Sequence, residues 1–219
     1  MTAPDQRQRF SALPTSRVEA FSDGVFAIAV TIIVLSLVDP RHEPGQLFPS
    51  LVAHWPDYVA YTAAFIYVGV IWLNHHQAFA RIRYANRPLL ALNLGVLFTT
   101  SLIAFPTAVV SDALREDLTG ADARTAVALY ALIAAAMCAS WVLLYAYLIR
   151  RPDLLADGVE PNYTRHGGWR SVAGIGLYLI AGLLGFFVYP LIALVVFPIL
   201  PLFYFLTSEG LGFADALTD

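Results

Sequence analysis

Two short polar motifs lie at the ends of apolar stretches and hold side chains suited to hydrogen bonding and charge stabilisation. The motifs comprise Arg17, Phe21, Ser22 and Asp23 at the start of one stretch, and Trp72, Asn74, His75 and His76 at the end of another. A carboxylate next to hydrocarbon is costly unless water or charge-assisted donors compensate it. Ser22 and Asp23 can also cap free amide groups at a helix start and favour its dipole. These residues predict a structural polar network, with no catalytic residue among them.

Adjacent His75 and His76 are poorly placed to hold one metal ion. Neighbouring positions on a helix point about 100° apart, which is an unfavourable geometry for two ligands of the same ion. Cys138 is the only cysteine and lies in an apolar run, so we interpret it as a small buried hydrophobic residue. The sequence predicts no tight metal site and no cofactor.

The composition is that of an integral membrane protein. Of the 219 residues, 58% are hydrophobic and only 13% are charged, whereas about a quarter of the residues of a soluble domain are charged. The mean hydropathy is +0.66. The net charge of -3 gives no indication of a nucleic-acid partner. The partner that this composition predicts is the lipid bilayer.

Hydropathy predicts an all-α membrane protein with six transmembrane helices per subunit. The predicted segments cover residues 18–38, 52–74, 88–111, 124–149, 170–188 and 190–207. Pro106 lies inside the third segment, where we expect it to cause a kink. We divide the chain into a polar N-terminal segment (1–16), a six-helix transmembrane domain (17–208) and a C-terminal tail (209–219).

The arginines predict how these helices are oriented. All 13 basic residues are arginine, and only Arg41, Arg115 and Arg124 fall on the side opposite the N-terminus. Because cytoplasmic loops carry the excess of positive charge, both termini are predicted to be cytoplasmic. The expected location is a plasma membrane that the chain crosses several times.

Three motifs resemble those of a known family. Arg-x-x-x-Phe-Ser-Asp stands at residues 17–23, Trp-Leu-Asn-His-His-Gln-Ala-Phe at 72–79, and a looser match joins Asn93-Leu94 with Phe105-Pro106-Thr107. The chain resembles the bacterial members of the transmembrane protein 175 family of potassium channels. Ala104 departs from the pattern, which has a proline before Phe105. The match is strong in the first three predicted helices and rests on hydropathy alone in the others.

This resemblance implies a homotetramer in the bacterial inner membrane, with the first helix of each subunit lining a central pore. It assigns the narrowest ring to Ile28 and hydroxyls just beyond that ring to Thr31. The next two pore-lining positions correspond to Ile32 and Leu35. It also implies that the two polar motifs join the first two helices through hydrogen bonds and so act as a scaffold for the pore helix.

The implied function is a potassium channel of modest selectivity, and potassium would pass Ile28 and Thr31 as the permeant ion. A hydrophobic constriction gates by dewetting, because an ion cannot shed its water there without replacement ligands. Potassium holds its water less tightly than sodium and therefore loses less free energy on passing. The sequence contains no Thr-Val-Gly-Tyr-Gly loop from which to build a carbonyl filter.

Three other functional classes are alternatives to a channel. A secondary transporter of a small solute or proton would need buried charges near the middle of the membrane, and helices three to six have none there. A membrane enzyme built on His75 and His76 lacks a second catalytic cluster. A structural membrane protein without a transport role is the third alternative.

Overall fold

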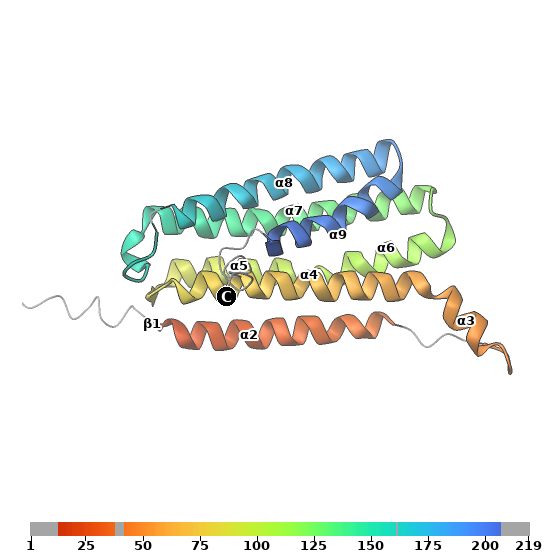
Figure 1. Cartoon of the computed structure of the whole chain (residues 1–219), viewed down its shortest axis with the longest axis horizontal. Helices are drawn as coiled ribbons and strands as arrows, with labels where there is room; N and C mark the ends of the chain where they lie inside the picture. The colour runs from red at the N-terminus through yellow and green to blue at the C-terminus, as the bar shows by residue number, and fades with distance from the viewer. Residues whose placement is uncertain (1–12, 38–41, 161, 207–219) are drawn as a thin grey trace, which may run out of the picture.

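The apolar runs of the sequence fold into long helices that lie side by side along one axis (Figure 1). The computed structural model describes residues 13–37, 42–160 and 162–206. The helices are α2 (Thr15–Ile32), α3 (Leu47–Ala53), α4 (Trp55–Ala80), α5 (Arg87–Ser101), α6 (Ala104–Glu116), α7 (Ala121–Arg150), α8 (Tyr163–Phe187) and α9 (Pro190–Leu206). Two 3₁₀ helices, η1 (Ile33–Ser36) and η2 (Pro152–Leu154), and two short strands, β1 (Leu13–Pro14) and β2 (Tyr84–Ala85), complete the described elements.

Four described segments are long and apolar enough to cross a bilayer. They are Thr15–Leu35, Arg87–Glu116, Ala121–Arg150 and Tyr163–Phe187. The pair α3 and α4 is bent by 50° and would add a fifth segment if it forms one span, whereas α9 is apolar but has only 17 residues. The fold is therefore mostly helical with several apolar spans, and six crossings stay a prediction.

The third predicted helix forms one apolar span, Arg87–Glu116, with a short interruption near the expected kink. It consists of α5 and α6, which are separated at Leu102 and Ile103. Pro106 lies in the first turn of α6, where its missing N–H costs no helical hydrogen bond. The break therefore falls just before the proline, so that Pro106 occupies the first turn of a helix, where proline is tolerated.

The helices form three layers (Figure 1). α7, α8 and α9 lie on one side, α4, α5 and α6 in the middle, and α2 on the opposite side. α7 and α8 approach each other closely, since a Cβ added to Gly182 would lie only 2.3 Å from the Cβ of Ala131. Small residues on the two helices thus allow their backbones to come close, as is common between membrane helices.

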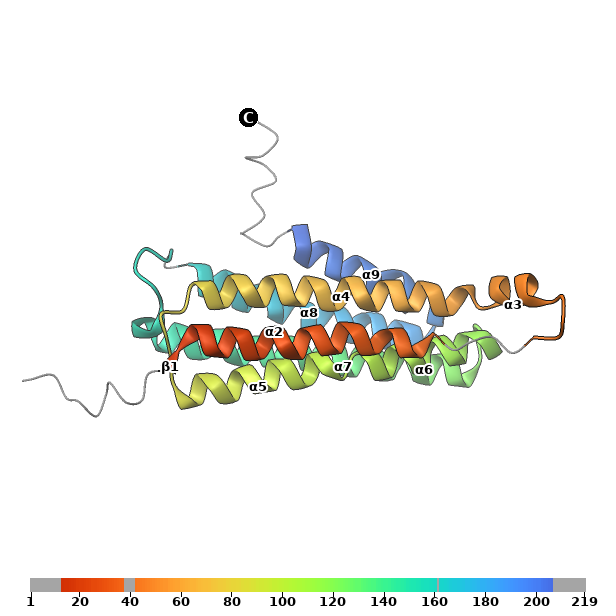
Figure 2. The same cartoon turned by 90° about the horizontal axis from the view of Figure 1, so that it is seen from below.

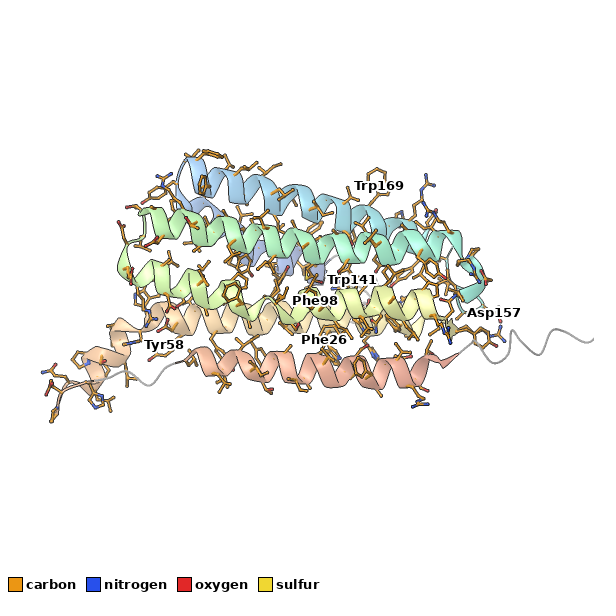
Figure 3. All side chains as sticks on the ribbon, turned by 180° about the vertical axis from the view of Figure 1, so that it is seen from behind. Phe26, Tyr58, Phe98, Trp141, Asp157 and Trp169 are labelled. Carbon is orange, nitrogen blue, oxygen red and sulfur yellow. The ribbon has the colours of Figure 1, made fainter. Side chains whose placement is uncertain are left out.

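α2 packs against α4 and α5 through one face only. The buried residues of that face are spaced at helical intervals: Val18, Ser22 and Phe26 in α2, and Ile33 in η1. Figure 3 shows Phe26 directed from α2 toward the rest of the bundle. Seen from below, α2 is the element nearest the viewer, so no described element covers its other face (Figure 2).

Two local devices fix the end of the bundle where α2 begins. β1 pairs with β2 in antiparallel fashion, with Leu13 opposite Ala85, so that the chain before α2 is held by the α4–α5 connection. Asn86 then caps α5, since its side-chain oxygen accepts a hydrogen bond from the Leu89 backbone N–H at 3.1 Å. The predicted N-terminal segment 1–16 is described only from residue 13 on, and the predicted tail 209–219 lies outside the described residues.

Candidate functional site

A chain of buried polar groups links α2, α5 and α4. The side-chain amide of Asn93 donates to the Ser22 hydroxyl at 3.0 Å, and its carbonyl oxygen lies 2.7 Å from Nε2 of His75. Because that oxygen can only accept, Nε2 of His75 is the donor. All three residues are at most 2% exposed. Each of these polar groups therefore has a hydrogen-bond partner although none reaches solvent. The bonds fix the positions of the three helices relative to one another.

Aromatic rings enclose the imidazole of His75. The ring of Phe79 stacks on it at 4.3 Å between centroids, and that of Phe26 meets it edge-on at 5.1 Å. Trp141 of α7 approaches from another side at 6.2 Å. Figure 3 shows Phe26 and Trp141 pointing into the bundle from different helices. The packing fixes the orientation of His75 and keeps other polar partners away.

A second link between α2 and α4 lies at the surface of the protomer. The indole N–H of Trp72 donates to a carboxylate oxygen of Asp23 at 2.8 Å. The ring of His76 lies against that of Trp72, with 6.1 Å between centroids. This link supplies the donor that a carboxylate beside an apolar run requires.

The expected capping role of Ser22 and Asp23 is wrong. α2 begins at Thr15, so both residues lie about two turns inside the helix, where backbone amides are already bonded. Their side chains instead bond across to Asn93 and Trp72. The early helix start follows from the β1–β2 pairing, which no hydropathy pattern indicates.

The remaining residues of the two motifs do not join this network. Arg17 and Phe21 are exposed on α2, and the Arg17 side chain forms no hydrogen bond or ion pair with the described part of the chain. Asn74 donates to the Val70 carbonyl of its own helix at 2.8 Å.

Asn93 belongs to the network although the two polar motifs do not include it. Its signal in the sequence is an amide side chain in the otherwise apolar run of α5.

The four predicted pore-lining residues all lie on the uncovered face of α2 and η1. Ile28, Ile32 and Leu35 are 59%, 51% and 75% exposed, and Thr31 is also exposed. The Thr31 hydroxyl lies 2.9 Å from the Ala27 carbonyl and 3.0 Å from that of Ile28. Its proton is thus occupied by the helix backbone, which leaves oxygen lone pairs available on the exposed side.

The described residues form no metal centre. No three His, Cys, Asp or Glu side chains come together as ligands within residues 13–37, 42–160 and 162–206. His75 has Asn93 and aromatic rings around it, and His76 lies on a different side of α4, against Trp72. The polar residues of the site form hydrogen bonds between helices, next to the exposed apolar stripe of α2.

Comparisons with known proteins agree with this architecture. The family model for the endosomal/lysosomal potassium channel TMEM175 matches residues 17–104, which include both polar motifs and Asn93. A potassium channel from Streptomyces collinus is 39% identical over 77% of this chain and 82% of its own length. A potassium channel from Chamaesiphon minutus is 34% identical over 84% of this chain and 87% of its own length.

A solved structure matches nearly the whole chain. The crystal structure of a lysosomal potassium-selective channel TMEM175 homologue from Chamaesiphon minutus superimposes with a TM-score of 0.77 and 30% identity. The match covers 90% of this chain and 98% of that one. The family is one of channels rather than enzymes. On the strength of the motifs, the fold and these relatives, the chain belongs to the TMEM175 potassium channel family.

Proposed function

We propose that this protein is a potassium channel in which copies of α2 surround a central pore. The observation that carries the proposal is the exposed stripe of Ile28, Thr31, Ile32 and Leu35, on the face of α2 and η1 that no other described element covers (Figure 2). A single helix cannot enclose a pore, so several copies must assemble, and the family resemblance favours a homotetramer. The named functions of the relatives from Streptomyces collinus and Chamaesiphon minutus support potassium as the permeant ion.

In this assembly Ile28 forms the narrowest, dry ring. A ring of branched apolar side chains offers no ligand to a dehydrating cation, so it closes the path by dewetting. Opening widens the ring enough for a partly hydrated ion. Thr31 lies about one turn farther along, and its lone pairs replace one or two waters of the ion. Potassium gives up water at a lower cost than sodium, which accounts for a modest preference.

The polar network holds the pore helix in place. Ser22 and Asp23 each bond to a different neighbouring helix, so α2 is fixed in rotation as well as in position. A rotation of one residue, about 100°, would turn Ile28 away from the axis. The two motifs therefore act on conduction through the orientation of α2, without contacting the ion.

We propose that the protein crosses the bacterial inner membrane six times with both termini in the cytoplasm. The arginine distribution supports this orientation, since Arg81, Arg83, Arg87, Arg150, Arg151, Arg165 and Arg170 lie at the same end of the bundle as the start of α2. The mechanism requires the bilayer and further copies of the chain as partners and no cofactor.

The test is reconstitution of the purified protein into liposomes with an outward potassium gradient. A channel releases potassium passively, and the flux with sodium in place of potassium is smaller. A secondary transporter of a small solute or proton gives flux only when a second solute is supplied. Flux that depends on a second solute, or no flux above that of empty liposomes, would overturn the proposal.

A further inference from the structure

A large apolar cavity lies on the side of α4 that faces away from α2. It has a volume of about 620 Å³ and is bounded by α4, α6, α7 and α9. Its interior is lined by residues such as Ala60, Ala63, Val110, Leu194 and Phe197. In both views α4 lies between α2 and α9 (Figures 1 and 2). The cavity is therefore separate from the proposed ion path.

The position of α9 leaves this space unfilled. Pro198 and Pro201 both line the cavity and lie inside α9. Proline within a helix removes a backbone hydrogen bond and bends the helix. Tyr130 of α7 stacks on Phe197 at 4.6 Å and closes the floor between α7 and α9. The volume falls in the range of about 300–1,000 Å³ that small-molecule sites occupy in proteins.

Arg115, which lines the cavity, pairs with two carboxylates. Arg115 and Trp55 line the cavity at the end of the bundle where α4 begins. A guanidinium nitrogen of Arg115 lies 3.3 Å from the carboxylate of Asp57, which is buried and also accepts from Ser111. The other terminal nitrogen pairs with Asp112, whose side chain is 69% exposed. An exposed carboxylate thus stands directly beside a half-exposed guanidinium.

We propose that this cavity binds one acyl chain of a zwitterionic phospholipid whose headgroup carries a primary ammonium. The apolar walls take the chain. The phosphate faces Arg115, which retains N–H donors beyond those that its two carboxylates use, and the ammonium faces Asp112. Trp55 fits the same level, because tryptophan favours the boundary between lipid and water. A purely anionic headgroup would meet the negative charge of Asp112 without a compensating group.

The experiment is native mass spectrometry of the full-length protein in detergent, titrated with phosphatidylethanolamine or phosphatidylglycerol of identical acyl chains. The wild type binds the ethanolamine lipid more tightly. Ala63→Phe fills the cavity and abolishes this binding, and Ala60→Leu weakens it as a milder change. Ala136→Phe adds the same ring to an exposed position of α7 outside the cavity and leaves binding unchanged.

Asp112→Asn tests the headgroup separately, at a position too exposed to be required for folding. It lowers the preference for the ethanolamine lipid by about two- to fivefold, the range of an exposed ion pair. Equal lipid binding by the wild type and Ala63→Phe would overturn the proposal, as would a wild type that retains detergent only or prefers phosphatidylglycerol. A change of oligomeric state in Ala63→Phe without any lipid bound to the wild type would assign the cavity to a second copy of the chain and equally overturn it.

Discussion

At the level of single residues, the buried amide of Asn93 is held by hydrogen bonds on both of its polar ends. It uses its donor toward Ser22 and its acceptor toward His75 at the same time. An apolar side chain in its place would leave two buried polar groups without partners. Such groups cost more than the net value of the hydrogen bond that is lost.

We therefore expect Asn93→Leu to destabilise the protein by about 2–6 kcal/mol, since each of the two unpaired groups costs about 1–3 kcal/mol. Asn74→Leu is the matched control, because within the described structure the side chain of Asn74 bonds only to the carbonyl of Val70 in its own helix. Thermal unfolding in detergent, followed by circular dichroism, measures the difference. Equal losses of stability in both variants would show that the Ser22–Asn93–His75 chain has no special role.

Trp72 provides a second test at the residue scale. Trp72→Phe keeps a ring but removes the N–H that reaches Asp23 at 2.8 Å. A hydrogen bond to a charged group contributes roughly 1.5–3 kcal/mol, so the variant is expected to lower the unfolding temperature and reduce potassium flux. Trp169→Phe, at a position that is 67% exposed and directed away from the bundle (Figure 3), should change neither. A variant Trp72→Phe with normal flux and stability would contradict a scaffold role.

Ile28 carries the prediction about selectivity. Ile28→Ala widens the proposed ring, and Ile28→Asn also supplies polar ligands to a dehydrating ion. Both variants should conduct more and discriminate less between potassium and sodium. Single-channel recordings with potassium on one side and sodium on the other measure conductance and selectivity together. Currents equal to those of the wild type would remove Ile28 from the ion path.

The sequence indicates the kinds of residues in the network but not its connections. The motifs place Ser22 and His75 in the right helices, yet whether His75 or His76 is buried depends on the rotation of α4. That rotation is set by contacts of His75 with the aromatic rings of Phe26 and Trp141, which come from helices far apart in the chain. For the same reason Asn93 could not be assigned as the residue that connects them.

At the scale of elements, glycines of α8 determine how closely it approaches α7. A Cβ on Gly182 would lie 2.3 Å from that of Ala131, whereas a Cβ on Gly176 would meet nothing within 4 Å. Both glycines lie on α8, but only Gly182 faces a neighbouring side chain at close range. Substitutions at the two positions therefore separate the effect of packing from that of helix propensity.

Gly182→Ala is expected to destabilise the protein by about 1–3 kcal/mol through overpacking. Gly176→Ala should be neutral or stabilising by up to about 1 kcal/mol, because alanine favours the helix. Thermal unfolding of the two variants under identical detergent conditions gives the comparison. A stabilised Gly182→Ala would contradict the close packing of α8 against α7 at Ala131.

The helices themselves follow closely from hydropathy, because an apolar run of this length has few alternatives in a membrane. Their ends are less accessible to sequence reasoning. The start of α2 depends on the pairing of β1 with β2, and the break between α5 and α6 falls before Pro106 rather than at it. Both features depend on contacts between residues that a hydropathy profile does not report.

At the scale of the whole molecule, α2 has one buried face and one apolar face that no described element covers (Figure 2). An exposed helix face of this kind meets lipid or further copies of the chain. The proposed tetramer makes it the wall of a pore, and the cavity beyond α4 then lies toward the lipid. The assembly thus separates ion conduction from the proposed lipid site.

Thiol accessibility along α2 shows whether this helix faces an aqueous ion path. Cys138 is the only cysteine, so a Cys138→Ala protein provides a background without thiols. In this background, Ile28→Cys and Thr31→Cys are compared with Leu132→Cys, which is 60% exposed on α7. An ion path along α2 predicts that a small water-soluble thiol reagent blocks potassium currents through the first two variants and leaves those of Leu132→Cys unchanged. Block of Leu132→Cys alone, or unchanged currents through all three, would contradict a pore lined by α2.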